Sequence, residues 1–334
     1  MKNLLQISSK LVLAGALATT FTFSQVQAAP ELTIKAAHAA STTNTGHLAL
    51  EYMDKELRER TDGAIGLEIF PNGQLGGERE LIESIQLGNI DMVFVSSAPL
   101  ASFNKKFFAL DMPFLFQDRE SVYKVLDGNI GEELLSSLDN VGMVGLGYWE
   151  NGFRQLTNNR QVVHTAEDVK GLDMRTMENQ IHLMTWRELG TNPAPLAFNE
   201  LYTALQQGTF EAQEGPINLF RDMRFDEVQK YISKTNHIYS PFVVLMNPEV
   251  QHQMSDDQQE IFRQVFQDTK AYQRGLAQKA DEAAEIELEE KGVTITTLTP
   301  EELKTFSSQM QPVYDRIKEI VGSDFANRVI EAAQ

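Results

Sequence analysis

Two arginines, Arg154 and Arg175, are the residues of this chain best suited to chemistry with a small ligand. They lie 21 positions apart, and each is next to an apolar segment with the character of a strand. An arginine side chain presents a planar set of N–H donors that matches the geometry of a carboxylate. A single surface arginine most often forms a salt bridge of little energetic consequence. A pair at the ends of strands instead indicates a clamp for an anionic ligand.

Candidate catalytic motifs are isolated and incomplete. Ser102 and Lys105 form one S-x-x-K pattern, but the serine-hydrolase motifs that accompany it elsewhere are missing. His164 and Glu167 are three positions apart, and no further metal ligands surround them. The sequence also lacks HExxH, a phosphate-binding loop, a nucleophile elbow and a dinucleotide fingerprint. We therefore predict a protein that is not an enzyme and that has no catalytic residue, metal or cofactor.

The composition narrows the class of ligand and partner. The chain has no cysteine, which excludes disulfides, cysteine-bound zinc, a thiol nucleophile and a lipid anchor on cysteine. Its formal net charge is −18, and removal of residues 1–28, which carry two lysines and no acidic residue, makes it −20. Such a charge disfavours binding to nucleic acid. An acidic protein that binds an anion must concentrate positive charge locally, which again points to the two arginines.

Residues 1–28 have the layout of a secretory signal peptide. Lys2 and Lys10 supply positive charge, an apolar run follows at residues 11–23, and small residues at Val26 and Ala28 fit a cleavage site. The apolar run is shorter than the roughly 20 residues that span a bilayer. We predict cleavage after Ala28 and a periplasmic mature protein.

The first half of the mature chain alternates predicted strands and helices. Strands at residues 32–37, 65–70 and 92–95 enclose helices at 46–60 and 78–87. This order predicts an α/β fold with a mainly parallel sheet and helices on both faces. Ligands of such sheets bind beyond the carboxyl ends of the strands.

Polar residues follow the predicted strands at this edge. His38 and Asn44 come after the first strand and Ser96 after the third. Glu78 opens the helix after the second strand, where a negative charge also favours the helix N-terminus by itself. We predict these four residues as candidate ligand contacts, although loops without a ligand role are polar as well.

The same pattern restarts in the second half. An apolar strand is predicted at 141–148, followed by a strand at 172–174 that ends at Arg175, helices at 180–189 and 199–207, a strand-like segment at 210–215 and a strand at 242–246. The mature chain of 306 residues is large for one core, so we predict two lobes. Lobe I comprises residues 29–152 and about 241–275, and lobe II about 153–240 and 276–334.

A very long helix is predicted near the end of the chain. Ser255 and Gln258 form a capping box that opens a helical pattern continuing to about Lys291. Roughly 35 helical residues span about 52 Å, which exceeds one small lobe, so this helix should cross both. Gly275 is the predicted place for a bend or break. Thr299 and Glu302 open a further helix in the same way.

The segments GYWENGFRQLTNN, EDVKGLDMR and PLAFNELYTALQQGTFEAQEGP resemble the matching stretch of the solute receptors of TRAP (tripartite ATP-independent periplasmic) transporters, the DctP-type family. The resemblance extends over about residues 32–322. It implies a two-lobe, type II-like binding-protein fold with a hinge and a long helix across both lobes. In this family the arginine that ends the KGLxxR strand grips a carboxylate, and Arg175 stands there. Arg154 matches a second arginine, and Phe198 matches an aromatic residue that closes over the ligand.

Two positions differ from the sialic-acid branch of the family. Gly215, after Glu214, stands where that branch has asparagine, and Ser96 stands where it has a carboxylate. Glu214 and Gly215 join the candidate ligand contacts, and sialic acid becomes a poor fit. With the aromatic residues Tyr148 and Trp149 nearby in the sequence, a hydroxylated ligand of about six carbons is favoured, such as a uronate or aldonate.

The resemblance implies a monomeric periplasmic receptor that closes around an organic acid and delivers it to membrane permease subunits driven by an ion gradient. A C4-dicarboxylate or another carboxylate is the alternative ligand. Two alternatives of another kind remain open: a secreted enzyme acting on carboxylated sugars, and a receptor that feeds a sensor kinase.

Overall fold

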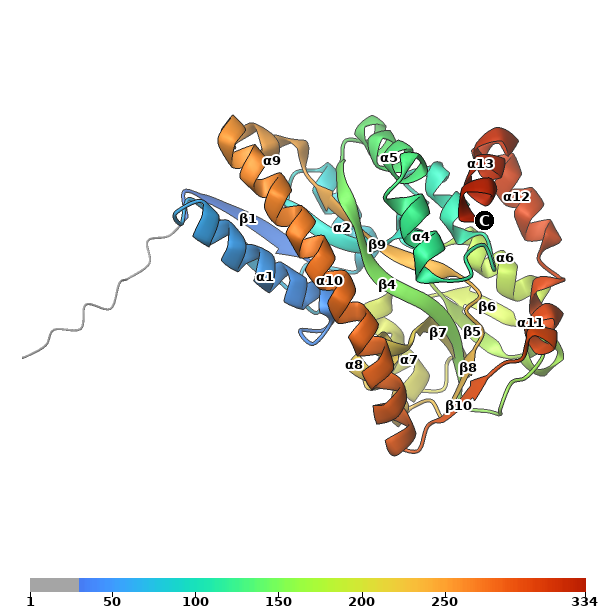
Figure 1. Cartoon of the computed structure of the whole chain (residues 1–334). Helices are drawn as coiled ribbons and strands as arrows, with labels where there is room; N and C mark the ends of the chain where they lie inside the picture. Colours follow the sequence, from blue (N-terminus) through green and yellow to red (C-terminus); the bar gives the residue numbers. More distant parts are fainter. Residues whose placement is uncertain (1–29) are drawn as a thin grey trace, which may run out of the picture.

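The computed structural model describes residues 30–334 (Figure 1), so the predicted signal peptide and its cleavage after Ala28 lie outside the described residues. The strands are β1 (Leu32–Ala37), β2 (Ile65–Phe70), β3 (Met92–Ser96), β4 (Val144–Asn158), β5 (Asp173–Thr176), β6 (Asn192–Pro195), β7 (Ala212–Pro216), β8 (Tyr231–Lys234), β9 (Tyr239–Met246) and β10 (Thr294–Thr297). The α-helices are α1 (Thr45–Arg60), α2 (Glu78–Gln86), α3 (Ser97–Leu100), α4 (Arg119–Leu126), α5 (Asn129–Ser136), α6 (Gln180–Glu188), α7 (Leu201–Gln206), α8 (Ile217–Asp222), α9 (Pro248–His252), α10 (Asp256–Glu290), α11 (Pro300–Ser307), α12 (Gln311–Val321) and α13 (Ser323–Ala333). Short 3₁₀ helices include η1 (Lys105–Asp111), η4 (Phe198–Glu200) and η5 (Phe225–Glu227).

The strands form one continuous sheet with parallel outer strands in each half. Its order is β2-β1-β3-β9-β4-β7-β5-β6, and β8 joins β4 to β10. In the first half β1 lies parallel to β2 and β3, and in the second half β5 lies parallel to β6 and β7. Between them, β9 is antiparallel to β3 and β4, and β4 is antiparallel to β7. The predicted α/β fold with two lobes is confirmed, and the two antiparallel strands join its halves.

Strand β4 is longer than predicted and belongs to both halves. It pairs with β9 at its beginning and with β7 and β8 at its end. Two irregularities interrupt its pairing with β9, between Gly145 and Gly147 and between Glu150 and Gly152. A β-bulge of this kind bends a strand and re-aims the side chain of the extra residue. The second bulge places Asn151 as that extra residue, at the point where the strand passes from one half to the other.

Helix α10 crosses both halves, as predicted (Figure 1). Its N-terminus carries the expected capping box between Ser255 and Gln258, and Thr299 and Glu302 form the same motif at α11. Of the predicted bend or break at Gly275, the break does not occur, because α10 is one helix of 35 residues. A single exposed glycine costs a helix only about 1 kcal/mol, which the buried face of α10 outweighs.

Buried apolar residues form three clusters that fix these elements. One lies between α1, α10 and the sheet of the first half, and includes Leu50 and Phe266. A second packs α7 and α8 against the last turns of α10. The largest cluster extends through both halves and includes Val93 from the first half and Trp186 from the second. Val329 of α13 also packs into it. Because α13 packs on α4 and α5, which precede β4, the exact division into lobes stays a prediction.

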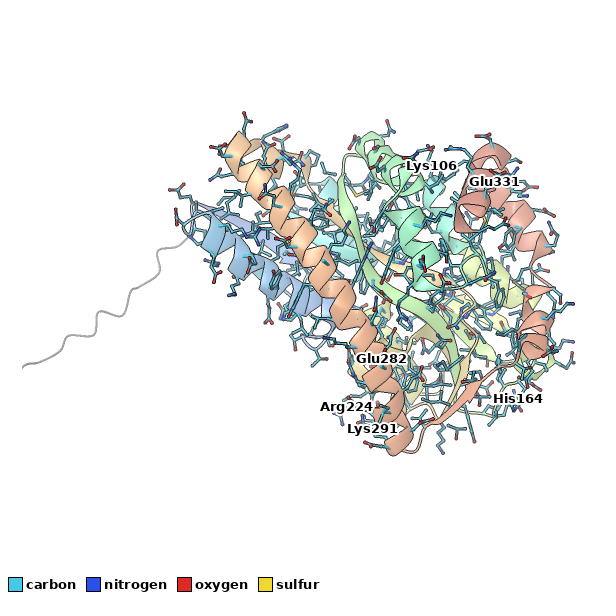
Figure 2. All side chains as sticks on the ribbon, viewed as in Figure 1. Lys106, His164, Arg224, Glu282, Lys291 and Glu331 are labelled. Atoms are coloured by element: carbon cyan, nitrogen blue, oxygen red, sulfur yellow. The ribbon has the colours of Figure 1, made fainter. Side chains whose placement is uncertain are left out.

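The side chains of His164, Glu282 and Lys291 lie exposed on the outside (Figure 2). His164, weighed as a metal ligand, is paired with Glu302 at 2.9 Å. Between residues 30 and 334, none of the helices combines the length and apolar character needed to cross a membrane.

Candidate functional site

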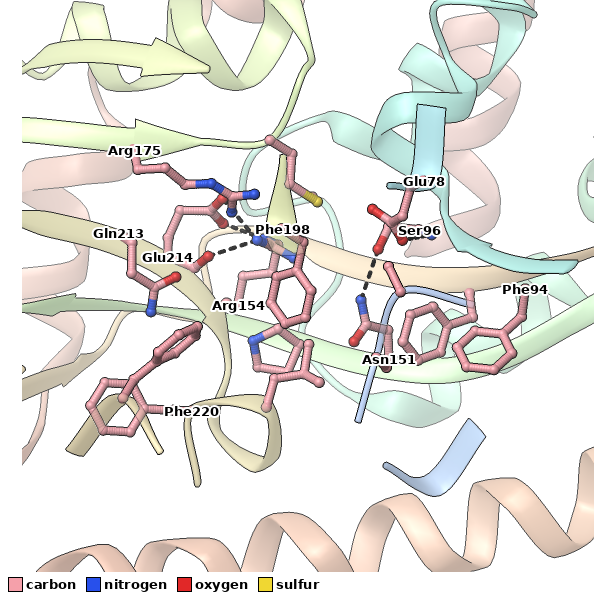
Figure 3. A pocket seen from close by; sticks show the side chains of 18 residues that line it. Glu78, Phe94, Ser96, Asn151, Arg154, Arg175, Phe198, Gln213, Glu214 and Phe220 are labelled. Carbon is pink, nitrogen blue, oxygen red and sulfur yellow. Dashed lines mark hydrogen bonds and ion pairs between the residues drawn. The ribbon is translucent and has the colours of Figure 1, made fainter. Parts of the chain in front are cut away.

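A narrow cavity lies where the two halves meet (Figure 3). Its empty volume is about 520 Å³, which includes the space at its opening to solvent. Its wall is built from the ends of β1, β3, β5 and β7, from the middle of β4, and from the starts of α2 and α8. This is the edge at which the parallel strands of an α/β sheet end, and where ligands of such sheets bind. Of the predicted contacts, the structure brings together Glu78, Ser96, Arg154, Arg175, Phe198, Glu214 and Gly215.

Arg175 is the penultimate residue of β5 and is 2% exposed. Its Nε and Nη2 donate to the backbone oxygen of Leu196 at 2.9 and 2.6 Å. It forms no salt bridge with any residue of the described part of the chain. Burial lowers the pKa of Arg175 to about 10, and the nearby Glu214 partly opposes this effect. The guanidinium is therefore a positive charge at neutral pH that is buried without a contacting counter-ion, a costly arrangement unless an anion arrives.

Arg154, in contrast, is fully engaged by Glu214. Its Nε and Nη2 donate to the Glu214 carboxylate, and Nη2 also donates to the Glu214 backbone oxygen at 2.7 Å. The two residues are diagonal neighbours on the adjacent antiparallel strands β4 and β7, where Arg154 lies opposite Pro216 and Glu214 opposite Leu156. Burial by itself would raise the pKa of Glu214, but Arg154, together with His182 and His237, holds that pKa well below its usual range. Arg154 thus lines the cavity with its charge already neutralised.

Polar groups on the opposite wall come from the first half and from the bulge in β4. The Ser96 backbone N–H donates to Glu78 Oε1 at 2.6 Å, and Asn151 Nδ2 donates to Ser96 Oγ at 3.3 Å. Burial raises the pKa of Glu78, opposed by the bonds from Ser96 and by the charges of Arg175 and Arg154. This wall therefore combines the Glu78 carboxyl with the Ser96 hydroxyl and the Asn151 amide.

Aromatic residues cover the remaining sides of the cavity. Phe198, from η4, packs edge-on against Phe225 with ring centroids 6.3 Å apart, and Phe94, Phe220 and Phe242 also contribute. Aromatic faces of this kind suit the C–H surfaces of a small organic ligand.

Two predicted contacts, His38 and Asn44, do not line the cavity. His38 is fully buried, lies 3.0 Å from His47 (Nε2 to Nδ1), and stacks on Phe94 at 4.5 Å. Burial lowers the pKa of His38 to about 3, with a further contribution from His47, so its ring is neutral. The Asn44 side chain accepts a bond from the Gly46 N–H and caps α1. Both residues lie behind the cavity wall.

Tyr148 and Trp149 also lie away from the ligand space. The Tyr148 hydroxyl donates to the Gly131 oxygen at 2.9 Å, and Trp149 stacks on Phe266 of α10. The expectation that they suit a hydroxylated ligand is therefore wrong, because both are core residues.

Sequence reasoning missed Asn151, Gln213 and Met177 among the lining residues. Alternation along a regular strand would place Asn151 and Arg154, three positions apart, on opposite faces. The bulge removes that alternation, and its sequence signal is Gly152, which directly follows Asn151 and has a positive φ of 129°. Gln213 directly precedes Glu214 and would likewise be assigned to the other face.

The profile of the bacterial extracellular solute-binding proteins, family 7, matches residues 36–320. The C4-dicarboxylate-binding periplasmic protein DctP of Rhodobacter capsulatus is 31% identical, over 93% of this chain and 94% of its own. The galactonate complex of the sugar acid binding protein DctPAm of Advenella mimigardefordensis superposes with a TM-score of 0.89 at 33% identity, covering 92% of this chain and 99% of its own. A TRAP periplasmic solute-binding protein of Polaromonas sp. JS666, bound to D-erythronate, superposes with a TM-score of 0.86 at 33% identity. The match covers 89% of this chain and 98% of the Polaromonas chain.

Proposed function

Because the chain belongs to family 7 of the bacterial extracellular solute-binding proteins, the TRAP receptors, we propose that it captures a small organic acid with Arg175 as the carboxylate clamp. The receptor would present this acid to membrane permease subunits driven by an ion gradient. We place it in the periplasm as a monomer, after cleavage of its signal peptide behind Ala28.

The state of Arg175 carries this proposal. Of the two guanidinium groups in the cavity wall, that of Arg154 is paired with Glu214, whereas that of Arg175 has, among residues 30–334, only a backbone carbonyl as partner. A carboxylate in the cavity would supply the missing counter-charge and accept charge-assisted hydrogen bonds. Binding energy is then concentrated on a feature that all organic acids share, and the remaining wall can select among them.

We propose that the preferred ligand is a sugar acid, such as an aldonate or uronate, and that a C4-dicarboxylate is the second candidate. The two solved structures at 33% identity hold galactonate and D-erythronate, both hydroxylated acids, while the R. capsulatus relative is named for C4-dicarboxylates. The Ser96 hydroxyl and the Asn151 amide on the wall opposite Arg175 support the same order, because neither carries a positive charge to pair with a second carboxylate.

Closure of the two lobes would complete the site. β4, β9 and α10 connect the halves, so these elements would bend while the parallel strands on either side move as units. We keep residues 29–152 with about 241–275 as lobe I, and about 153–240 with 276–334 as lobe II.

A thermal-shift and calorimetric panel tests the function. It compares D-galactonate, D-glucuronate and succinate with D-galactose, which has hydroxyls but no carboxylate. We expect the sugar acids to raise the melting temperature most, D-galactose to leave it unchanged, and stabilisation of about 2.7 kcal/mol at a ligand concentration of 100 Kd. A stronger shift with succinate would reverse the ligand order, and equal shifts with D-galactose would contradict the clamp. Mass spectrometry after prolonged incubation should recover each acid unchanged, whereas any product would indicate an enzyme.

A further inference from the structure

Asn151 is held rigidly at the bulge of β4. The side chain of Gln273, from α10, bonds both backbone groups of the preceding residue, Glu150, with Oε1 to the N–H and Nε2 to the carbonyl, each at 2.8 Å. On the other side, the Asn151 amide nitrogen donates to Ser96 Oγ at 3.3 Å. The backbone and one end of the amide are thus fixed before any ligand arrives.

The other end of the same amide has no partner. Asn151 is 2% exposed, and its Oδ1 is a buried acceptor without a hydrogen bond to any of the residues 30–334. The residue lines the cavity, and Figure 3 shows its amide beside Ser96. A buried, unpaired acceptor is costly, and few are tolerated in a folded protein. A donor from outside the chain is the partner that this oxygen lacks.

The charges around the cavity define which donor would fit. Arg175, on one side, offers N–H donors to a single carboxylate, while Arg154 is already neutralised by Glu214. On the other side, Glu78 Oε1 and Asn151 Nδ2 are both bonded to Ser96, and Asn151 Oδ1 is left as an acceptor. A ligand that satisfies both sides carries a carboxylate at one end and hydroxyl donors at the other.

We propose that Asn151 is a specificity-determining residue whose Oδ1 accepts a hydrogen bond from a hydroxyl group of the ligand, so that the site selects polyhydroxylated monoacids over dicarboxylates. This inference rests on the proposed function and specifies its substrate class. A second carboxylate, ionised at neutral pH, has no proton to donate and would face the acceptor Oδ1 of Asn151. The selection thus combines an attractive contact for one class of acid with repulsion of the other.

The test measures by calorimetry how the wild type binds D-galactonate and its analogues lacking one hydroxyl, among them the 2-, 3- and 6-deoxy acids. An analogue that lacks the hydroxyl bonded to Asn151 leaves this buried acceptor without a partner, so the Kd of at least one analogue should be about fivefold higher, or more, than that of D-galactonate. In Asn151→Leu, which is similar in size but has no acceptor, this analogue and D-galactonate should bind within about twofold of each other. Discrimination that is equally strong in Asn151→Leu overturns the proposal, and so does a wild type that binds every analogue equally.

Asn151→Asp supplies the second variant, because it keeps an acceptor oxygen at the same place. It should retain the preference for the intact hydroxyl and bind succinate more weakly than the wild type does. Loss of the hydroxyl preference in Asn151→Asp, with its circular dichroism spectrum unchanged, would mean that the amide acts as a donor and would overturn the inference. Failure of every carboxylic acid to bind the wild type is a different result, and it would contradict the proposed function itself.

Discussion

Arg175 directs two of its guanidinium donors at one acceptor, the backbone oxygen of Leu196, through Nε at 2.9 Å and Nη2 at 2.6 Å. β5 and β6 are parallel neighbours, so this contact ties the clamp to the rigid end of the sheet. The contact fixes the plane of the guanidinium and leaves Nη1 without a protein acceptor among residues 30–334. Orientation in advance of binding lowers the entropy that a ligand must remove.

Replacement of Arg175 by methionine should lower the affinity for the ligand without lowering the stability of the protein. Truncating one partner of a buried charged pair costs about 2–5 kcal/mol in binding, so the Kd for the preferred acid should rise about thirtyfold or more. Because the variant also removes a buried charge that lacks a counter-ion, the free energy of unfolding of the ligand-free protein should not fall. Calorimetry and urea denaturation measure the two quantities.

Arg316→Ala is the matched control for this prediction. Arg316 lies half exposed on α12 and, within the described part of the chain, pairs only with Glu319, so its loss should change neither Kd nor stability appreciably. Arg175→Lys keeps the charge but not the planar donor set, and should bind with intermediate affinity. Wild-type affinity in Arg175→Met would show that the carboxylate is held elsewhere.

Glu214→Gln should destabilise the protein, because it leaves Arg154 buried without its counter-charge. Breaking one side of a buried ion pair costs about 3–5 kcal/mol, whereas the exposed counterpart Glu319→Gln should cost less than about 1 kcal/mol. Chemical denaturation of both variants without ligand gives the comparison. A small effect in Glu214→Gln would mean that Arg154 is available to a ligand after all.

Local signals in the sequence were sufficient for much of the framework. The capping box at Ser255 and the strand that carries Arg175 depend on residues close together in the chain; the capping box occurs as predicted, and the strand ends one residue later, at Thr176. Gly275 shows the limit of such signals, because long-range packing along α10 outweighs a local preference for a break.

The electrostatic states within the site depend on contacts that no local pattern contains. Arg154 and Arg175 look equivalent in the sequence, yet only the former meets a carboxylate, from a residue 60 positions further along. Asn151 enters the cavity through a bulge that is stabilised by Gln273, 123 positions from the Glu150 backbone that it bonds. Such pairings follow from strand order and helix docking.

Asp281 of α10 should make stability depend on pH. It shares Arg119 with Glu150, and burial raises the pKa of Asp281 to about 7, although Arg119 opposes the shift. An unfolded aspartate has a pKa near about 3.9, so the folded protein binds this proton more tightly. Its contribution to stability is therefore greatest at low pH and is lost as the pH rises through about 7.

Asp281→Asn removes this titration, so its stability relative to the wild type should increase from pH 5 to pH 8 by about 1 kcal/mol or more. Urea denaturation at several pH values provides the measurement. Asp324→Asn, whose carboxylate is almost fully exposed on α13, should show no such trend. A constant difference between Asp281→Asn and the wild type would indicate an ordinary pKa for Asp281.

Gln273→Leu should weaken both the fold and the ligand site. Glu150 pairs across the sheet with Pro241, which has no N–H to donate, and Gln273 supplies the donor and the acceptor that Glu150 needs. Leucine would leave two buried backbone groups unsatisfied at about 1–3 kcal/mol each, so the free energy of unfolding should fall by about 2 kcal/mol or more. Because Asn151 follows Glu150 directly, the affinity for the preferred acid should fall as well.

Gln264→Leu is the control for this prediction. Gln264 is exposed on the same helix and, within the described part of the chain, bonded only to Glu260, so the variant should change stability by no more than about 0.5 kcal/mol. Equal stability losses in the two variants would show that Gln273 acts through helix propensity, and that the bulge does not depend on it.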